Sequence, residues 1–240
     1  MATSLGIGGQ IVTDGLVLCL DAANKDSYPG SGTTWSDLSG NGYNAVSQAD
    51  AATTEGRFNS GGFFDLNEAS DVYFLISGLN NYNFNPEFSI SFWMKNTGGD
   101  YRAIFQNSDN IAVNSDSVDI RFGREDYYGG DNNGTRCGFI LNSDNINSEV
   151  NFYVPLDVWT NVHCSYDGST MKVYTNGEEF GSTSTAITVS QVTNDVKLFR
   201  HYNTGEDLVN PFANIKLYNR ALTATEIQQN YNALKGRFGL

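Results

Sequence analysis

Five side chains near the N-terminus have the chemistry of a calcium site. Asp21, Asn24, Asp37, Asn41 and Asn44 supply carboxylate and amide oxygens within one predicted strand and the loops that follow it. Ca²⁺ takes about six to eight oxygen ligands of these kinds. The segment also has a purely structural alternative, because asparagine and glycine are good turn formers. The residue types therefore make Ca²⁺ a candidate cofactor at these five positions.

A second group has the chemistry of a sugar site. Tyr127, Tyr128, Asp131, Asn132 and Asn133 lie with two glycines in one predicted loop. Aromatic rings can stack on the apolar faces of sugars, and carboxylate and amide groups can hydrogen-bond to sugar hydroxyls. The alternatives are a solvated loop or, because the stretch is acidic, a weaker metal site. We predict that a bound carbohydrate contacts this loop.

Alternating apolar and polar residues predict the strands that must position these groups. The period of two is clear over residues 16–21, 88–95, 118–122 and 215–218, and such alternation marks strands with one buried face. Residues 161–183 predict a three-strand meander, because Asp-Gly and Asn-Gly pairs separate its runs. Many short strands with Gly-rich turns predict an all-β fold.

One helix is predicted, at the C-terminus. Thr223 and Glu226 have the spacing of a capping box, and Ile227 and Leu234 recur at helical spacing before a stop signal at Gly236. This short helix is expected to pack as a lid on the strands.

The Gly-rich residues 1–13 predict an extended N-terminal arm ahead of a single domain over residues 14–240. The arm has too few apolar residues to fold alone, and a flexible backbone loses much entropy when it is ordered. We therefore expect the arm to dock on another subunit or another protein rather than on its own core. The alternative is a frayed terminus.

Charge and cysteine usage restrict the partners. Lys and Arg number 14 against 27 Asp and Glu, which gives a formal net charge of −13. A chain this acidic is repelled by nucleic acid and by anionic membrane surfaces, so neither is an expected partner. The three cysteines, Cys19, Cys137 and Cys164, are odd in number and scattered, so we expect unpaired thiols and assembly in a reducing cytoplasm.

Four stretches resemble one family of sandwich domains when they are taken in order. Together they resemble the laminin-G-like, concanavalin A-like lectin/glucanase superfamily. The resemblance implies a jelly roll of two packed antiparallel sheets, in which Trp35 and Trp159 fill the core or its rim, ligand stacking being the alternative. The stretches are Asp14–Ala22 with Trp35–Asn44, Phe88–Lys95, Trp159–Gly168 with Met171–Gly177, and Ile215–Leu222 with Glu226–Ile227.

Residues 14–21, 27–35 and 227–239 are more narrowly similar to laminin-G-like proteins of tailed bacteriophages. That resemblance implies a non-enzymatic virion protein, either a fibre or a capsid-surface component, with a structural or host-recognition role. Its expected location is the virion, assembled in the host cytoplasm. Its expected partners are other virion proteins or copies of itself, with a host surface glycan as a further candidate. The alternatives are a cellular carbohydrate-binding or adhesion module and a glycan-cleaving enzyme.

The acidic motif of glucanases on this fold is missing. The string Glu-x-Asp-x-x-Glu, which places two carboxylates for glycoside hydrolysis, does not occur. Glu178 and Glu179 are adjacent on a predicted strand, so their side chains are expected on opposite faces. His163 also lies on a predicted strand and is expected to be structural. We therefore expect the chain not to be an enzyme.

The missing carboxylate motif predicts that the protein does not hydrolyse β-glucans. Reducing ends released from a β-glucan should not exceed those released by a heat-inactivated control. Release above that control would overturn the prediction.

Overall fold

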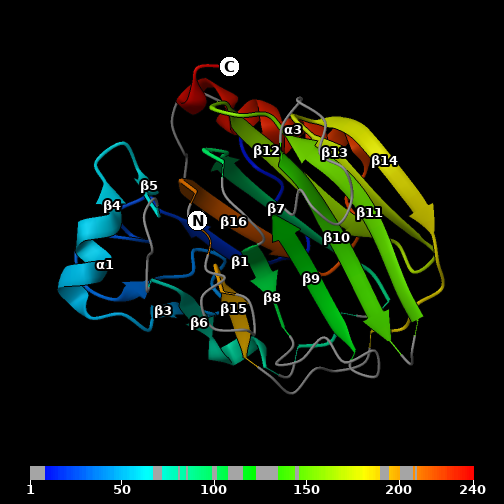
Figure 1. Cartoon of the computed structure of the whole chain (residues 1–240), viewed down its shortest axis with the longest axis horizontal. Coiled ribbons are helices and arrows are strands. Elements are labelled where there is room, and N and C mark those ends of the chain that lie inside the picture. Colours follow the sequence, from blue (N-terminus) through cyan, green and yellow to red (C-terminus); the bar gives the residue numbers. More distant parts are fainter. Residues whose placement is uncertain are drawn as a thin grey trace.

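Strands with alternating side chains pair into two antiparallel sheets that pack face to face in the computed structural model (Figure 1). The structure describes residues 9–66, 72–80, 82–84, 86–98, 102–107, 116–122, 135–143, 146–189, 195–200, 208 and 210–240. Within these residues the predicted all-β, two-sheet antiparallel sandwich with a short C-terminal helix is confirmed.

Sheet A holds the predicted meander and the central strands. Its β1 (Leu16–Asp21) pairs with β16 beside the main path. In spatial order that path is β14 (Glu178–Ser184), β13 (Thr170–Thr175), β12 (Trp159–Tyr166), β7 (Phe88–Lys95), β16 (Phe212–Tyr218), β5 (Phe63–Phe64) and β4 (Phe58–Asn59).

Sheet B is the second layer. In spatial order its strands are β11 (Ile146–Val154), β10 (Thr135–Ser143), β9 (Ser117–Phe122), β8 (Arg102–Gln106), β15 (Val196–Leu198), β6 (Phe74–Ile76), β3 (Ala45–Ser47) and β2 (Thr34–Trp35).

The main core lies between the two sheets. In β9, Val118, Ile120 and Phe122 belong to this core, and the residues that alternate with them do not. Trp35 is fully buried, and its ring packs edge-on against Phe64 at 5.0 Å between ring centroids. Packing in the core is therefore the role of Trp35, as predicted. All three cysteines are buried and none of them is joined in a disulfide, which is also as predicted.

The helical segments lie at the margins of the sandwich. The helix α1 (Ala51–Arg57) was not predicted from the sequence; it begins where the Asp50 carboxylate accepts the Thr53 N–H at 2.7 Å. It lies beside β4 and β5 at one side of the molecule, opposite β14 (Figure 1). The 3-10 turns η1 (Ser77–Leu79) and η2 (Lys235–Phe238) are shorter. No helix within the described residues is long and apolar enough to cross a membrane.

The helix α3 (Ala224–Leu234) covers the face of sheet A that points away from sheet B (Figure 1). Its predicted capping box is present, because Thr223 and Glu226 each accept a hydrogen bond from the other's backbone N–H. Ile227 and Leu234 bury their side chains against the sheet. Full burial of such a side chain stabilises the fold by about 1.5–3 kcal/mol.

Polar and aromatic contacts hold both ends of the α3–η2 segment. At the start, Arg220 bonds the Glu226 carboxylate at 2.6 Å. At the end, Arg237 pairs with the buried Asp21 at 2.6 Å, and Phe238 stacks on Trp93 at 4.1 Å between ring centroids. The segment is thus fastened to the sheet along its whole length.

The described part of the N-terminal arm packs on its own chain. The backbone N–H of Val12 donates to Asn230 of α3 at 2.8 Å, and the Tyr218 hydroxyl donates to the Val12 carbonyl at 3.1 Å. Gln229 donates to the Gln10 carbonyl at 2.8 Å. The expectation that the arm docks on a neighbour rather than on its own core is therefore wrong for residues 10–12, because Asn230 of α3 and Tyr218 of β16 offer buried partners to Val12. Residues 1–8 lie outside the described part of the chain.

A row of polar side chains crosses sheet A beneath and beside α3. Strand pairing connects its members in the order Cys19, Lys216, Ser91, His163, Tyr174 and Glu179. Lys216 and His163 are buried, and neither ring nitrogen of His163 has a hydrogen-bond partner among the described residues. Burial, aided by the Lys216 charge, lowers the pKa of His163 to about 3. The imidazole is therefore neutral in the folded protein at neutral pH.

Burial of His163 makes the stability of the fold sensitive to acid. Because the folded pKa of His163 lies below its unfolded value, the unfolded chain binds the extra proton as the pH falls below about 6.5. The free energy of unfolding should therefore fall between pH 7 and pH 4 by about 3 kcal/mol more in the wild type than in His163→Phe. Urea denaturation of both proteins at several pH values measures this, and parallel pH profiles would contradict it.

Candidate functional site

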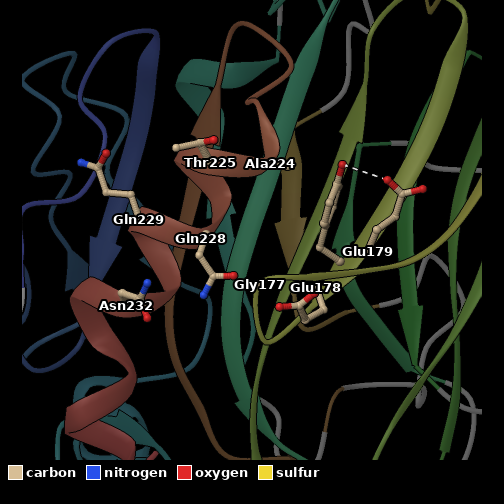
Figure 2. A pocket seen from close by; sticks show the side chains of 9 residues that line it. Gly177, Glu178, Glu179, Ala224, Thr225, Gln228, Gln229 and Asn232 are labelled. Atoms are coloured by element: carbon tan, nitrogen blue, oxygen red, sulfur yellow. Dashed lines mark hydrogen bonds between the residues drawn. The ribbon is translucent and has the colours of Figure 1, made fainter.

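A groove opens between the turn that joins β13 to β14 and the helix α3, with a volume of about 610 Å³ (Figure 2). Figure 2 shows Gln228 pointing from the helix toward Gly177 and Glu178, with Glu179 farther along the groove. Its lining residues are Tyr174, Gly177, Glu178, Glu179, Ala224, Thr225, Gln228, Gln229 and Asn232.

The groove depends on a tight turn at Asn176 and Gly177. Both residues have positive φ angles, 52° and 85°, as a two-residue hairpin turn of this kind requires. A Cβ atom on Gly177 would lie 2.7 Å from the Gln228 side-chain oxygen. Glycine therefore permits the turn, and a larger residue would also displace the end of the flexible Gln228 side chain.

Two carboxylates lie on the β14 side of the groove. Glu179 accepts hydrogen bonds from the Tyr174 hydroxyl at 3.3 Å and from Lys172 at 3.1 Å. Burial raises the pKa of Tyr174, so its hydroxyl stays protonated as a donor. Glu178 and Glu179 both contribute to the lining of the groove, and their consecutive pairing with Thr175 and Tyr174 keeps the alternation that the sequence predicts. The register shift of β13 and β14 lies beyond them, between Glu179 and Gly181.

The lining is chemically suited to a polyhydroxyl ligand. Two carboxylates and the amides of Gln228 and Asn232 provide acceptors, and the amides and the Thr225 hydroxyl provide donors. Gln229 is the exception, because its amide already donates to the arm. Among the described residues that line the groove there is no Lys, Arg or His.

A second hollow, of about 360 Å³, lies beside β4 on the far side of the domain. Its wall includes Tyr28 and Phe58, whose rings contact each other at 5.0 Å. The Tyr28 hydroxyl already donates to the Gly32 carbonyl at 2.9 Å. This hollow offers fewer free polar groups than the groove.

Comparison with known proteins gives the family. Residues 67–228 match the model of the concanavalin A-like lectin/glucanases superfamily. The chain belongs to this superfamily. A comparison with curated proteins gives no match.

Solved structures with the superfamily fold include receptor-binding domains of botulinum neurotoxins. The serotype D binding domain matches with a TM-score of 0.64 at 15% identity, over 92% of this chain and 51% of that one. A serotype D domain in complex with N-acetylneuraminic acid matches at 0.60 and 17%, over 92% and 51%. A type C neurotoxin, whose cell entry depends on two ganglioside molecules, matches at 0.58 and 17%, over 93% and 52%. The chain spans about half the length of these structures.

Three of the predicted calcium ligands meet in one loop of the superfamily domain. The Asp37 carboxylate accepts bonds from the Cys19 and Ser39 backbone at 2.9 Å each and from the Tyr43 N–H at 3.1 Å. Asn44 accepts the Asp37 N–H at 2.9 Å. Asn41 donates to the Val17 carbonyl at 2.9 Å. These side chains therefore join the loop to β1.

The other two predicted ligands are engaged elsewhere. Asp21 pairs with Arg237, and Asn24 accepts the Asp26 N–H at 2.9 Å within its own turn. No group of three or more His, Cys, Asp or Glu in the described part of the chain has a metal-binding arrangement. Ca²⁺ at these five positions stays a prediction, and the hydrogen bonds give each residue a structural role.

The predicted sugar-binding residues Tyr127, Tyr128, Asp131, Asn132 and Asn133 lie outside the described residues. They belong to the connection between β9 and β10. Near the ends of these strands, Arg136 donates to Asn151 at 3.0 Å.

The outer face of sheet B carries a buried acid, Asp119 of β9. Asp119 is fully buried and pairs with Arg121 at 2.9 Å. Burial raises the pKa of Asp119, and Arg121 opposes that effect. Sequence alternation placed Asp119 on the face away from the core, but it gave no sign that this face is covered.

The geometry of Asp37 generates a stability prediction. Asp37→Ala should lower the free energy of unfolding by about 2 kcal/mol, because it leaves backbone donors of β1 and the loop without partners. The exposed Asp26 provides the matched control, and Asp26→Ala should leave stability nearly unchanged. Urea denaturation measures both.

The same pair of proteins tests calcium. If Asp37 acts only through hydrogen bonds, the wild type should give the same denaturation curve in Ca²⁺ and in a chelator. Stabilisation of the wild type by Ca²⁺, absent in Asp37→Ala, would instead establish the metal site predicted from the sequence.

Proposed function

We propose that this chain is a non-catalytic glycan-binding module and that the groove between β14 and α3 receives the sugar. The observation that carries the proposal is the lining of the groove. Carboxylates, side-chain amides and a threonine hydroxyl converge there from two separate elements, Glu178 and Glu179 from one and Gln228 and Asn232 from the other. Groups of these kinds, held by a rigid scaffold, bind sugar hydroxyls through paired hydrogen bonds.

The fold supports the same conclusion. Among the structures with this fold, one neurotoxin domain is a complex with N-acetylneuraminic acid and another belongs to a toxin that depends on gangliosides. At 15–17% identity these likenesses concern the fold. They support the class of ligand without assigning the residues that bind it.

Exposure of the two glutamates favours binding over cleavage. Glycoside hydrolysis needs one carboxyl group kept protonated by its surroundings. Glu178 is exposed, and the Glu179 side chain is 44% exposed and paired with Lys172. Both carboxylates are therefore open to solvent rather than enclosed in a pocket.

We also propose a second sugar contact and a biological setting. The loop that carries Tyr127, Tyr128 and Asp131 is the second contact, on the strength of its residue types.

The setting is the surface of a phage virion, where the module would recognise a host glycan or join other virion proteins. Its support is the resemblance of the first and last segments to tailed-phage proteins. Mass spectrometry of gradient-purified particles tests it, and absence of the chain from every particle fraction would contradict it.

The glycan-binding proposal predicts that a bulky side chain in the groove abolishes binding. Thr225 is exposed and lines the groove, so Thr225→Trp should fill it without disturbing the core. The exposed Ala186, which follows β14 and lies outside the groove lining, provides the control Ala186→Trp. A glycan array probed with the three proteins should show binding for the wild type and the control only.

Two results would contradict the proposal. Binding by none of the proteins to any glycan would reject glycan recognition by this chain. Equal binding by all three would reject the groove and favour the loop that contains Tyr127.

A further inference from the structure

The groove carries net negative charge on its walls. Glu178 and Glu179 line it, and none of its described lining residues is cationic. The nearest ion-pair partner is Lys172, and its ammonium lies 3.1 Å from the Glu179 carboxylate, so one of the two acids is partly compensated. Glu178 keeps an exposed carboxylate that points into the same space (Figure 2).

One feature acts in the opposite direction. The first residues of α3, Ala224 and Thr225, also line the groove, and a helix N-terminus carries about half a positive charge. The Thr223 side chain caps this end, and the Glu226 carboxylate occupies the first turn. The cap takes up the Glu226 N–H, and the partial charge of the helix terminus is smaller than the charges of two carboxylates, so the two glutamates determine the sign of the groove.

We propose that the groove prefers amino sugars, that is, glycans that carry a protonated amine, over neutral glycans and over sialylated or otherwise acidic ones. This inference rests on the proposed function. A sugar ammonium donates up to three hydrogen bonds, which match the carboxylates of Glu178 and Glu179 and the amide oxygen of Gln228. A sugar carboxylate would face the same groups with no lining cation to pair with.

The solvent exposure of Glu178 and Glu179 determines how strongly their charges change the affinity for a sugar. Exposed ion pairs change affinity by roughly two- to fivefold each. With two glutamates, the preference of the groove for a cationic over a neutral sugar should reach about tenfold at low salt. Salt screens such pairs, so the preference should shrink as the ionic strength rises.

Isothermal titration calorimetry with matched probes tests this inference. The probes are a glucosamine oligosaccharide below the pKa of its amines, the N-acetylated oligosaccharide of the same length, and sialyllactose. The intact chain should bind the glucosamine oligosaccharide most tightly and sialyllactose most weakly. The double variant Glu178→Gln, Glu179→Gln should bind the glucosamine oligosaccharide no more tightly than the acetylated one, because glutamine carries no charge.

A charge-matched control separates the groove from the overall acidity of the chain. Asp26 and Asp157 are exposed and lie outside the groove lining, so Asp26→Asn, Asp157→Asn removes the same charge elsewhere. This control should keep the full preference. Thermal melting confirms that all three proteins are folded.

The remaining outcomes of the titrations each overturn the inference. Sugar binding with no charge preference, or with sialyllactose as the tightest ligand, overturns the inference and leaves the proposed function standing. A preference lost equally in both double variants also overturns it, because the attraction is then long-range. Binding to none of the three probes overturns the inference, whereas the proposed function fails only if the wider glycan array also shows no binding.

Discussion

Docking of α3 on the outer face of sheet A is the interaction on which the rest of this structure depends. The helix buries Ile227 and Leu234 against the sheet, and Asn230 bonds the N-terminal segment at Val12. Lys216 and His163 are buried on the same face of the sheet that the helix covers. The helix and the N-terminal segment at Val12 thus form a third layer on the outer face of sheet A.

The groove is a consequence of that docking. One wall is the β13–β14 hairpin and the other is the helix, so neither element forms the site alone. The Gln228 side chain of the helix lies against Gly177 of the hairpin, where the two elements meet. The polar residues of the groove are therefore carried by two elements of regular secondary structure rather than by a loop.

Local patterns predicted the elements better than they predicted the site. The period of two gave the strands, the Asn176-Gly177 pair gave the hairpin, and Thr223 with Glu226 gave the start of α3, because each signal acts over a few residues. The end of the helix differs from the prediction, since the chain continues past Gly236 into η2 and turns at Gly239, with φ 76°. Arg237 and Phe238 hold that extension through contacts with residues far away in sequence.

Long-range packing explains what the sequence could not reveal. Glu178 and Glu179 border a groove only because α3 docks beside their strand, and that docking leaves no periodic signal in the sequence. In the same way Asp37 resembled a metal ligand by type, yet its oxygens bond the backbone of β1 and the adjoining loop.

Amide NMR spectra of the labelled chain, recorded during titration with the oligosaccharide that binds most tightly, test the central claim most directly. We expect shift changes to concentrate in Tyr174–Glu179 and in Ala224–Asn232, the two walls of the groove. Shift changes confined to other surfaces, with both walls unchanged, would contradict a sugar site in the groove.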